Sequence, residues 1–312
     1  MASFLDTDHH EIYVSERDLL LRIDGIVRTI DEPFADISIL PTLIVSELAA
    51  SQLKVVLSGD GGDEQFCGYD HYDRASRVDR LRRSIPRWSR RFLGKRLRGV
   101  NGGSGKVARL GAIMMADDHE AVCQALISQW QLPSVVYPQG TSDEEGPDDI
   151  SGACAWTDIR DYGMLRDMRL YLPDDILHKV DRASMACGLE AREPLLDHRL
   201  IEYAWTMPLD FKVRNGKTKW PLRQILSKMM PETLYDRPKK GFAVPVSKWL
   251  RGELRSWADS VLFHGAAPQF FEMSRVRKLW NEHQSGALDR GTYLWTLLIL
   301  SAWVSQAEAA NL

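Results

Sequence analysis

The chain has 312 residues, of which 44% are hydrophobic and 27% are charged, a composition typical of globular proteins in water. Its net charge of −3 argues against a protein that binds nucleic acid through overall charge. No stretch approaches the roughly 20 apolar residues of a membrane span, and the first residues lack the basic and apolar regions of a signal peptide. The four cysteines are scattered, without a C-x-x-C pair, so we expect reduced thiols. These features predict a cytoplasmic protein without a nucleic-acid or membrane partner.

The first predicted elements are a strand and a helix. Residues 11–14 (EIYV) are short and β-prone, which predicts a strand. Ser15 followed by Asp18 resembles a capped helix start, and the apolar periodicity continues to about Ile30. The pattern therefore predicts a helix that begins near Ser15 and ends near Ile30.

A second helix and a second strand follow. Residues 31–36 (DEPFAD) interrupt the helical periodicity, and Pro41 suits the first turn of a helix that runs to about Ser51. Residues 54–57 (KVVL) then predict the next strand. Strands that alternate with helices are typical of a parallel sheet, so we expect an α/β fold.

The most informative segment is residues 58–64 (SGDGGDE), directly after the predicted strand. Its glycines, Gly59, Gly61 and Gly62, let the backbone turn sharply and approach a ligand closely. Its carboxylates suit Mg²⁺, which proteins normally hold with one or two carboxylates while substrate phosphates supply further oxygens. Ligands of open α/β sheets bind beyond the carboxyl ends of the strands. The segment therefore predicts a site for Mg²⁺ and a polyphosphate.

Composition alone leaves two other interpretations of this segment open. A stretch rich in Gly and Asp also forms plain turns, because Asp hydrogen-bonds its own backbone and Gly supplies unusual dihedral angles. A calcium loop is less favoured, since the D-x-D-x-D-G spacing and the Glu at the twelfth position of an EF-hand are absent.

After Tyr72 the pattern becomes helical, and it predicts no strand in the rest of the chain. Residues 77–98 contain ten Lys or Arg and a single acid, Asp79, with Trp88 and Phe92 among them. This segment predicts either a nucleic-acid-binding patch or, more commonly, a solvated helix face.

Residues 161–208 have a strong helical pattern. Pro173, followed by two aspartates, indicates a helix start. Asp175 and Lys179 are four residues apart and would form an ion pair that supports the helix. Later, residues 237–242 (RPKKGF) place three cations beside a Pro/Gly turn, where they could reach a phosphate or simply aid solubility.

Taken together, these motifs resemble the synthetase domain of glutamine-dependent asparagine synthetases and their amidotransferase relatives. The matching stretches are residues 31–36, 55–69 (VVLSGDGGDEQFCGY), 171–197 (YLPDDILHKVDRASMACGLEAREPLLD) and 237–249, with Arg251 and Gly252. The resemblance implies an α/β fold in which a partial adenine-nucleotide α-hydrolase-like (PP-loop) parallel sheet is followed by a large, mainly helical region.

We accordingly expect three parts. Residues 1–75 would be the remainder of the α/β nucleotide-binding core, residues 76–160 a helical insertion-like region with a basic face, and residues 161–312 the helical part of the synthetase domain. The N-terminal glutaminase domain is expected to be absent, because its nucleophile is the Cys after the initiator Met and this chain has Ala2 there. We expect Cys67 to be a small buried residue and not a substitute nucleophile.

The resemblance implies an asparagine synthase (glutamine-hydrolysing) type of ligase with ATP and Mg²⁺ as cofactors. The side-chain carboxylate of aspartate attacks the α-phosphorus of Mg-ATP, giving β-aspartyl-AMP and pyrophosphate. Ammonia, free or derived from glutamine, then displaces AMP to form the amide. Activation is needed because an oxide is a very poor leaving group, whereas AMP is a good one. Positioning and charge neutralisation carry most of such phosphoryl chemistry.

The resemblance also implies roles for individual residues. Ser58 and Gly59 would contact AMP, and Asp63 would bind the Mg²⁺ that accompanies pyrophosphate. Lys239 matches a lysine that neutralises charge developing on the α-phosphate and pyrophosphate, a task suited to a compact ammonium.

Two carboxylates complete the expected catalytic set. Asp60 falls where many relatives carry Glu, at a position linked to intermediate formation and to proton removal from the attacking nitrogen. Its shorter side chain leaves that role less well supported. Asp175 would orient the substrate or a partner of the base, or would only pair with Lys179. Arg192 and Asp197 are expected to be structural links beneath the site.

One family motif does not occur in the chain. The family begins this domain with a strand and a Ser-Gly-Gly-x-Asp-Ser loop that wraps the pyrophosphate, and the 312 residues contain no such loop. We therefore expect the first two strands of the sheet to be missing. Two hypotheses follow: an amide-forming domain that is incomplete on its own, acting on aspartate or another carboxylate, or a non-catalytic or complementing subunit that pairs with a glutaminase or loop-bearing chain.

Overall fold

The computed structural model describes residues 1–15, 17–18, 21–98, 105–127, 157–236, 244–265 and 267–309. Helices dominate these residues, and the only sheet among them has two strands. None of the helices in these ranges is long and apolar enough to cross a membrane. The expected α/β character with a large helical region is confirmed, whereas the PP-loop sheet and the three-part division of the chain stay predictions.

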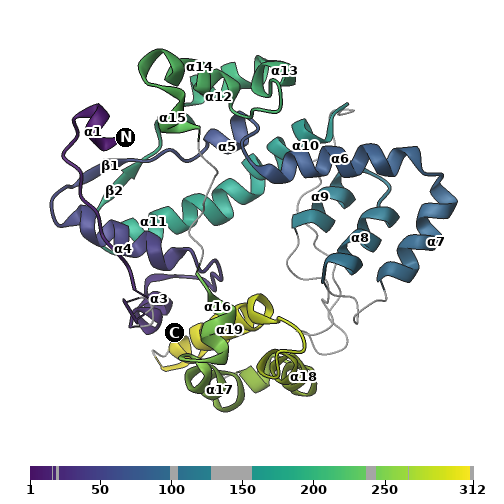
Figure 1. Ribbon diagram of the computed structural model, residues 1–312. Helices are drawn as coiled ribbons and strands as arrows, with labels where there is room; N and C mark the ends of the chain where they lie inside the picture. Colours follow the sequence, from purple (N-terminus) through teal and green to yellow (C-terminus); the bar gives the residue numbers. More distant parts are fainter. Residues whose placement is uncertain are drawn as a thin grey trace.

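The sheet pairs β1 (Val55–Leu57) with β2 (Glu190–Arg192) in parallel, in the register Val55↔Glu190 and Leu57↔Arg192. Two further backbone bonds extend this ladder, Glu190 N–H to Lys54 O at 2.9 Å and Ser58 N–H to Arg192 O at 2.8 Å. Figure 1 shows the pair at the left of the molecule, next to α4 (Ile39–Ala50) and α11 (His178–Met185). The pairing confirms the predicted strand near residues 54–57 and its parallel partnering.

Two strand predictions were wrong. Residues 11–14 have no strand structure and are exposed, because a strand needs a neighbour for its backbone hydrogen bonds and no described residue supplies one there. In turn, β2 lies in the region where no strand was predicted. Its sequence, Glu-Ala-Arg, has low β-propensity, so only its pairing with β1 makes it a strand.

The largest apolar core joins the first helices to the last ones. It contains buried side chains from α3 (Ile23–Thr29) and α4, and from the C-terminal helices α16 (Val246–Arg251), α17 (Arg255–His264), α18 (Met273–Gln284) and α19 (Gly291–Ala309). Trp249, Leu250 and Leu294 are fully buried there. Figure 1 shows α3 and α16 to α19 in the lower part of the molecule. The short helix η5 spans Ala267–Gln269. The predicted second helix near residues 41–51 is thereby confirmed as a core element, α4.

The first predicted helix is present at residues 17–18 and in α3 (Ile23–Thr29) within the described ranges. Asp18 and Ser15 do exchange hydrogen bonds, with Ser15 N–H donating to Asp18 Oδ2 at 2.9 Å and Asp18 N–H donating to Ser15 Oγ at 3.2 Å. Residues 17 and 18 are helical, and α3 ends at Thr29, close to the predicted end near Ile30. A short helix, α1 (Ala2–Leu5), precedes it and buries none of its residues.

A separate bundle of helices forms the opposite side of the molecule (Figure 1). It consists of α6 (Asp70–Ser84), α7 (Arg87–Arg98), α8 (Gly105–Met115), α9 (His119–Ile127) and α10 (Ile159–Arg166). A small apolar core that includes Ala75, Ile113, Val122 and Tyr162 holds it together. Helices α7 and α8 approach so closely that a Cβ on Gly111 would lie 2.6 Å from Arg98 N and 2.8 Å from Gly94 O.

One helical rod links this bundle to the sheet. Helix α10 continues without a break into the π-helix η3 (Asp167–Leu177) and then into α11. Pro173 lies inside η3, so the prediction that it starts a helix was wrong. The wider π turn tolerates a residue without an N–H donor, and such turns are frequent at functional sites.

The remaining elements cover the end of β1. They are α5 (Gly62–Gln65), η4 (Pro194–Leu196), α12 (His198–Thr206), α13 (Leu209–Lys212), α14 (Trp220–Met229) and α15 (Glu232–Tyr235). Figure 1 shows α12 to α15 at the top of the molecule, above the β1–α5 connection.

The close contact between α7 and α8 makes a testable prediction. Gly111→Ala should lower the free energy of unfolding by about 1–3 kcal/mol, because the added methyl meets backbone atoms that cannot move aside without separating the helices. Gly25→Ala is the matched control, since a Cβ at Gly25 would have nothing within 4 Å and Ala favours a helix. Urea unfolding of both variants checks this, and equal stabilities would contradict the packing described.

Candidate active site

The loop of residues 58–64 connects β1 to α5 and needs glycine at one position in particular. Gly61 caps α5 with φ +86°, and a Cβ there would lie 2.1 Å from Leu196 Cδ2. Gly59, in contrast, has open space where a Cβ would be, so its backbone is accessible to a ligand. The Ser58 hydroxyl donates a hydrogen bond to Asp60 Oδ2. The loop is therefore anchored at Gly61 and open at Gly59.

The predicted metal ligand Asp63 lies beside a cation that the sequence did not reveal. Lys219 Nζ is 3.0 Å from Asp63 Oδ1, and both side chains are partly exposed. Lys219 caps α14 in the left-handed conformation, φ +53°, and its N–H donates to Phe66 O at 3.0 Å. Gly68 makes room for the pair, because a Cβ there would lie 2.1 Å from Asp63 Oδ1 and 2.2 Å from Lys219 Cε. The only local signal was the Pro221 that marks the start of α14.

A buried polar network lies behind the loop. Tyr69 Oη donates to Glu64 Oε1 at 2.7 Å, and His71 Nε2 lies 2.7 Å from Asp167 Oδ2. Glu64 and Asp167 are each 1% exposed, and each has a second carboxylate oxygen without a hydrogen-bond partner. Burial raises the pKa of Glu64 above its usual range. The first contact joins α5 to the residue before α6, and the second joins α6 to η3.

A second group of charges surrounds Asp175. Its predicted ion pair with Lys179 is confirmed at 3.5 Å, but Lys179 Nζ lies closer to Asp36 Oδ2, at 2.7 Å. Burial, followed by the charge of Asp36, raises the pKa of Asp175 to about 7. Burial alone would also raise the pKa of Asp36, but the charge of Lys179 and hydrogen bonds from Lys179 and Ser38 outweigh it and lower that pKa. Lys179 therefore mainly compensates Asp36, and Asp175 keeps a raised pKa.

Tyr171 lies between the two groups. Its ring is 5.9 Å from that of Tyr69. Burial raises its pKa, and the charges of Asp175, Asp36, Asp167 and Glu64 add to the shift. Tyr171 is thus a partly buried tyrosine under the influence of acidic groups from both sets.

Of the other predicted residues, Asp60 lies within electrostatic range of Glu193, the residue after β2. The pKa of Glu193 is raised by burial and by the charge of Asp60. Lys239 lies outside the described residues. Ser58, Gly59 and Asp60 thus lie in the turn after β1, and Asp63 lies in the first turn of α5.

The two residues expected to be structural make only local contacts. Arg192, at the end of β2, donates to Glu190 Oε1 at 2.7 Å. Asp197 caps α12 by accepting from Arg199 N–H at 2.9 Å. Cys67 is fully buried, and burial raises the pKa of its thiol to about 12, as expected of an unreactive core residue.

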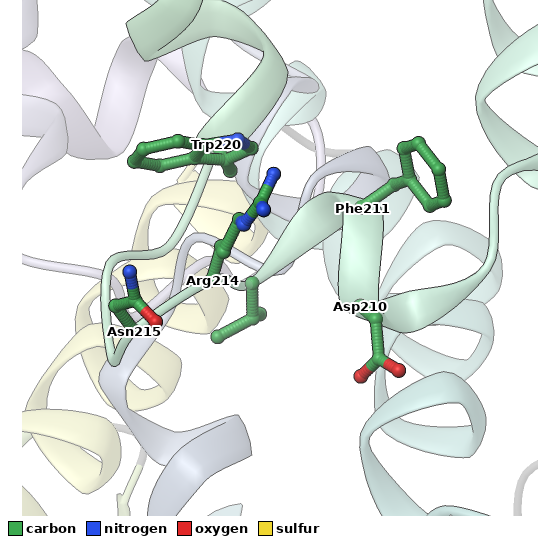
Figure 2. Close-up of a pocket in the computed structure, with 6 residues that line it drawn as sticks. Asp210, Phe211, Arg214, Asn215 and Trp220 are labelled. Atoms are coloured by element: carbon green, nitrogen blue, oxygen red, sulfur yellow. The ribbon is translucent and has the colours of Figure 1, made fainter.

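A pocket of about 410 Å³ lies between α13 and α14, lined by Asp210, Phe211, Val213, Arg214, Asn215 and Trp220. Figure 2 shows that Arg214 lies under the Trp220 ring, whereas Phe211 and Asp210 point away from it. The guanidinium carbon is 5.9 Å from the Trp220 ring centroid. The side chains do not converge on one point, and none of the predicted site residues lines this pocket, so we do not assign the nucleotide site to it.

Comparison with known proteins agrees with the motifs. The sequence model of the asparagine synthase family matches residues 1–305. The chain is 31% identical to a putative glutamine-hydrolysing asparagine synthetase of Mycobacterium bovis, over 97% of this chain and 47% of that protein. It is 27% identical to the glutamine-hydrolysing asparagine synthetase 1 of Bacillus subtilis, over 97% of this chain and 48% of that protein.

A more distant relative carries a different name. The amidase chry2 of Gibberella zeae is 26% identical over 81% of this chain and 41% of that protein. The chain thus spans about half the length of the curated relatives it matches. The family match over almost its whole length shows that the chain belongs to the asparagine synthase family.

Proposed function

We propose that residues 58–64 form the AMP side of a site for ATP-dependent amide formation of the asparagine synthetase type. The observation that carries this proposal is the ion pair of Asp63 with Lys219, 3.0 Å apart at the carboxyl end of β1. A site for a metal phosphate needs a carboxylate for the metal and a cation for the phosphate. Both lie together at the position where α/β sheets bind ligands.

The donor set fits Mg²⁺ held mainly by phosphate oxygens. Asp63 offers a hard carboxylate oxygen, and the described residues contain no group of three or more His, Cys, Asp or Glu that could hold a metal ion by themselves. Mg²⁺ is usually bound by one or two carboxylates together with substrate phosphates. When bound, it would neutralise charge on the phosphates. We assign Asp63 as its ligand and Ser58 and Gly59 as contacts of AMP.

The cations and the remaining carboxylates would complete the reaction. Lys219, displaced from Asp63 when the metal binds, would turn its ammonium towards the phosphates, and Lys239 would neutralise charge that develops on them. Asp60 would take the proton from the attacking nitrogen. Asp175, whose pKa of about 7 leaves it partly protonated at neutral pH, would orient the substrate through a hydrogen bond. Aspartate is the proposed carboxylate substrate, and ammonia or glutamine-derived nitrogen the proposed amine.

The open edge of the sheet supports the second hypothesis, in which another polypeptide segment completes the site. Within the described residues β1 has a single strand neighbour, and its Val55 and Leu57 side chains are 40% and 73% exposed. Parallel sheets are normally covered on both faces, and two strands alone are marginally stable. We propose that a segment bearing the pyrophosphate loop pairs with β1, from the same polypeptide or from a partner chain. An alternative is that the same reaction converts a carboxylate other than aspartate into its amide.

The site assignment predicts the effect of two substitutions. Asp63→Asn should weaken Mg-ATP binding, and both it and Lys239→Ala should lower the rate of AMP release by at least about 100-fold, because each removes charge compensation at the phosphates. AMP release with aspartate and ammonium, in the presence of the loop-bearing segment where it is required, and calorimetry with Mg-ATP are the measurements. Asp210→Asn, an exposed carboxylate outside the loop, is the control. Full activity of both variants would refute the assignment.

A further prediction concerns pH. The pKa of Asp175 is about 7 in the folded protein against 3.8 for an ordinary Asp, so the folded state binds more protons than the unfolded state between these values. The wild type should therefore lose stability relative to Asp175→Asn as the pH rises from about 4 to 7, by about 1–2 kcal/mol after screening by solvent. Urea unfolding at both pH values measures this difference. The neighbouring exposed Asp174→Asn should show no such trend, and a pH-independent difference for Asp175→Asn would contradict the prediction.

A further inference from the structure

Helix α7 presents two chemically different faces. Its inner face packs on α8, with Gly94 against Gly111 and the buried guanidinium of Arg90 donating to Met114 O at 3.3 Å. Its outer face points away from α8. Figure 1 shows α7 at the edge of the molecule farthest from β1 and β2.

The structure divides the basic segment of residues 77–98 into two sets of cations. Five of its ten cations form ion pairs: Arg82 and Arg83 with Asp79, and Arg87, Arg90 and Arg91 with Asp117. The described residues provide no such acidic partner for Arg77, Arg80, Lys95, Arg96 or Arg98. The last three lie on α7 and give it a local positive charge, although the chain as a whole carries −3.

The same helix exposes two large aromatic side chains. Trp88 and Phe92 are 78% and 61% exposed, and because they are four residues apart they lie on the same side of the helix. Arg96 covers one face of the Phe92 ring, with its guanidinium carbon 4.7 Å from the ring centroid. Exposed aromatic groups of this size mark interaction surfaces when they cluster. We call Trp88, Phe92, Lys95 and Arg96 the outer face of α7.

We propose that the outer face of α7 binds the surface of a bilayer that contains anionic lipids. Tryptophan and phenylalanine partition into the boundary between head groups and acyl chains, while lysine and arginine on the same helix attract anionic head groups. An exposed helix face can bind the flat surface of a bilayer, which offers no groove. We expected no membrane partner because the sequence has no membrane span. That property does not report the charge and the exposed aromatic groups on one face of a single helix.

Nucleic acid is the less favoured occupant. A nucleic-acid surface uses aromatic rings as stacking platforms for bases, but Arg96 occupies one face of Phe92. Five of the ten cations in residues 77–98 are also held in ion pairs with Asp79 or Asp117, so these five side chains are not free to follow a nucleic-acid backbone. These observations argue against the nucleic-acid-binding patch, one of the two interpretations of residues 77–98 that the sequence left open.

Vesicle sedimentation with the full 312-residue chain tests the proposal. The wild type should bind phosphatidylcholine vesicles that contain phosphatidylserine, bind pure phosphatidylcholine vesicles much more weakly, and lose binding as salt is added. The double variant Trp88→Ala/Phe92→Ala should lower the partition coefficient at least about tenfold. Tyr203→Ala/Phe211→Ala is the matched control, because these aromatic residues are 62% and 64% exposed but lie on α12 and α13. The control should bind like the wild type.

A second variant keeps the proposal testable if the first one folds poorly. Lys95→Gln/Arg96→Gln should reduce binding to anionic vesicles and flatten its salt dependence, with an unchanged circular dichroism spectrum because both residues are exposed. Equal vesicle binding by the wild type and the folded variants would overturn the proposal. It would also be overturned if the wild type bound no vesicles but bound single-stranded or duplex oligonucleotides in a way that Trp88→Ala/Phe92→Ala abolished.

Discussion

Three residue pairs between β1 and β2 join two distant segments of the chain, and the candidate site depends on this pairing. The bond from Ser58 N–H to Arg192 O continues the ladder into the loop, so the first residue of the loop is held by the end of β2. The residue after β2, Glu193, is then close enough to Asp60 for the charge of Asp60 to raise its pKa. A break in this pairing would separate the loop from the long helical rod that carries Asp175, since α11 leads into β2.

Around this pairing, the chain places four acids in buried or partly buried positions, which lowers stability unless their charges are compensated. Glu64, Asp167, Asp36 and Asp175 all lie around η3 or its neighbours, and each needs a hydrogen bond or a cation to offset the cost of burial. Lys179 provides only part of this compensation. Perturbed carboxylates of this kind cluster at functional sites, and the π-helical stretch in the same place agrees with that pattern.

The sequence predicted those parts of the structure that have local signals. The helix at residues 39–50 has a favourable Pro41, and β1 and its glycine loop carry their own apolar and turn patterns, so both were found. Strand β2 was missed because Glu-Ala-Arg becomes a strand only through a partner far away in the chain. Lys219 was missed for the same reason, since its meeting with Asp63 is a tertiary contact. The location of Lys239 relative to the loop stays a prediction from family resemblance.

The distance in sequence between β1 and β2 also has a consequence for synthesis of the protein. Val55, Val56 and Leu57 leave the ribosome long before Glu190 exists, so the strand must wait while the whole helical bundle of α6 to α9 is made. Contacts of such high sequence separation form late, and an unpaired apolar strand invites non-native association during that interval. The nascent chain should therefore be most exposed to aggregation, and most dependent on chaperones, until α11 and β2 have emerged.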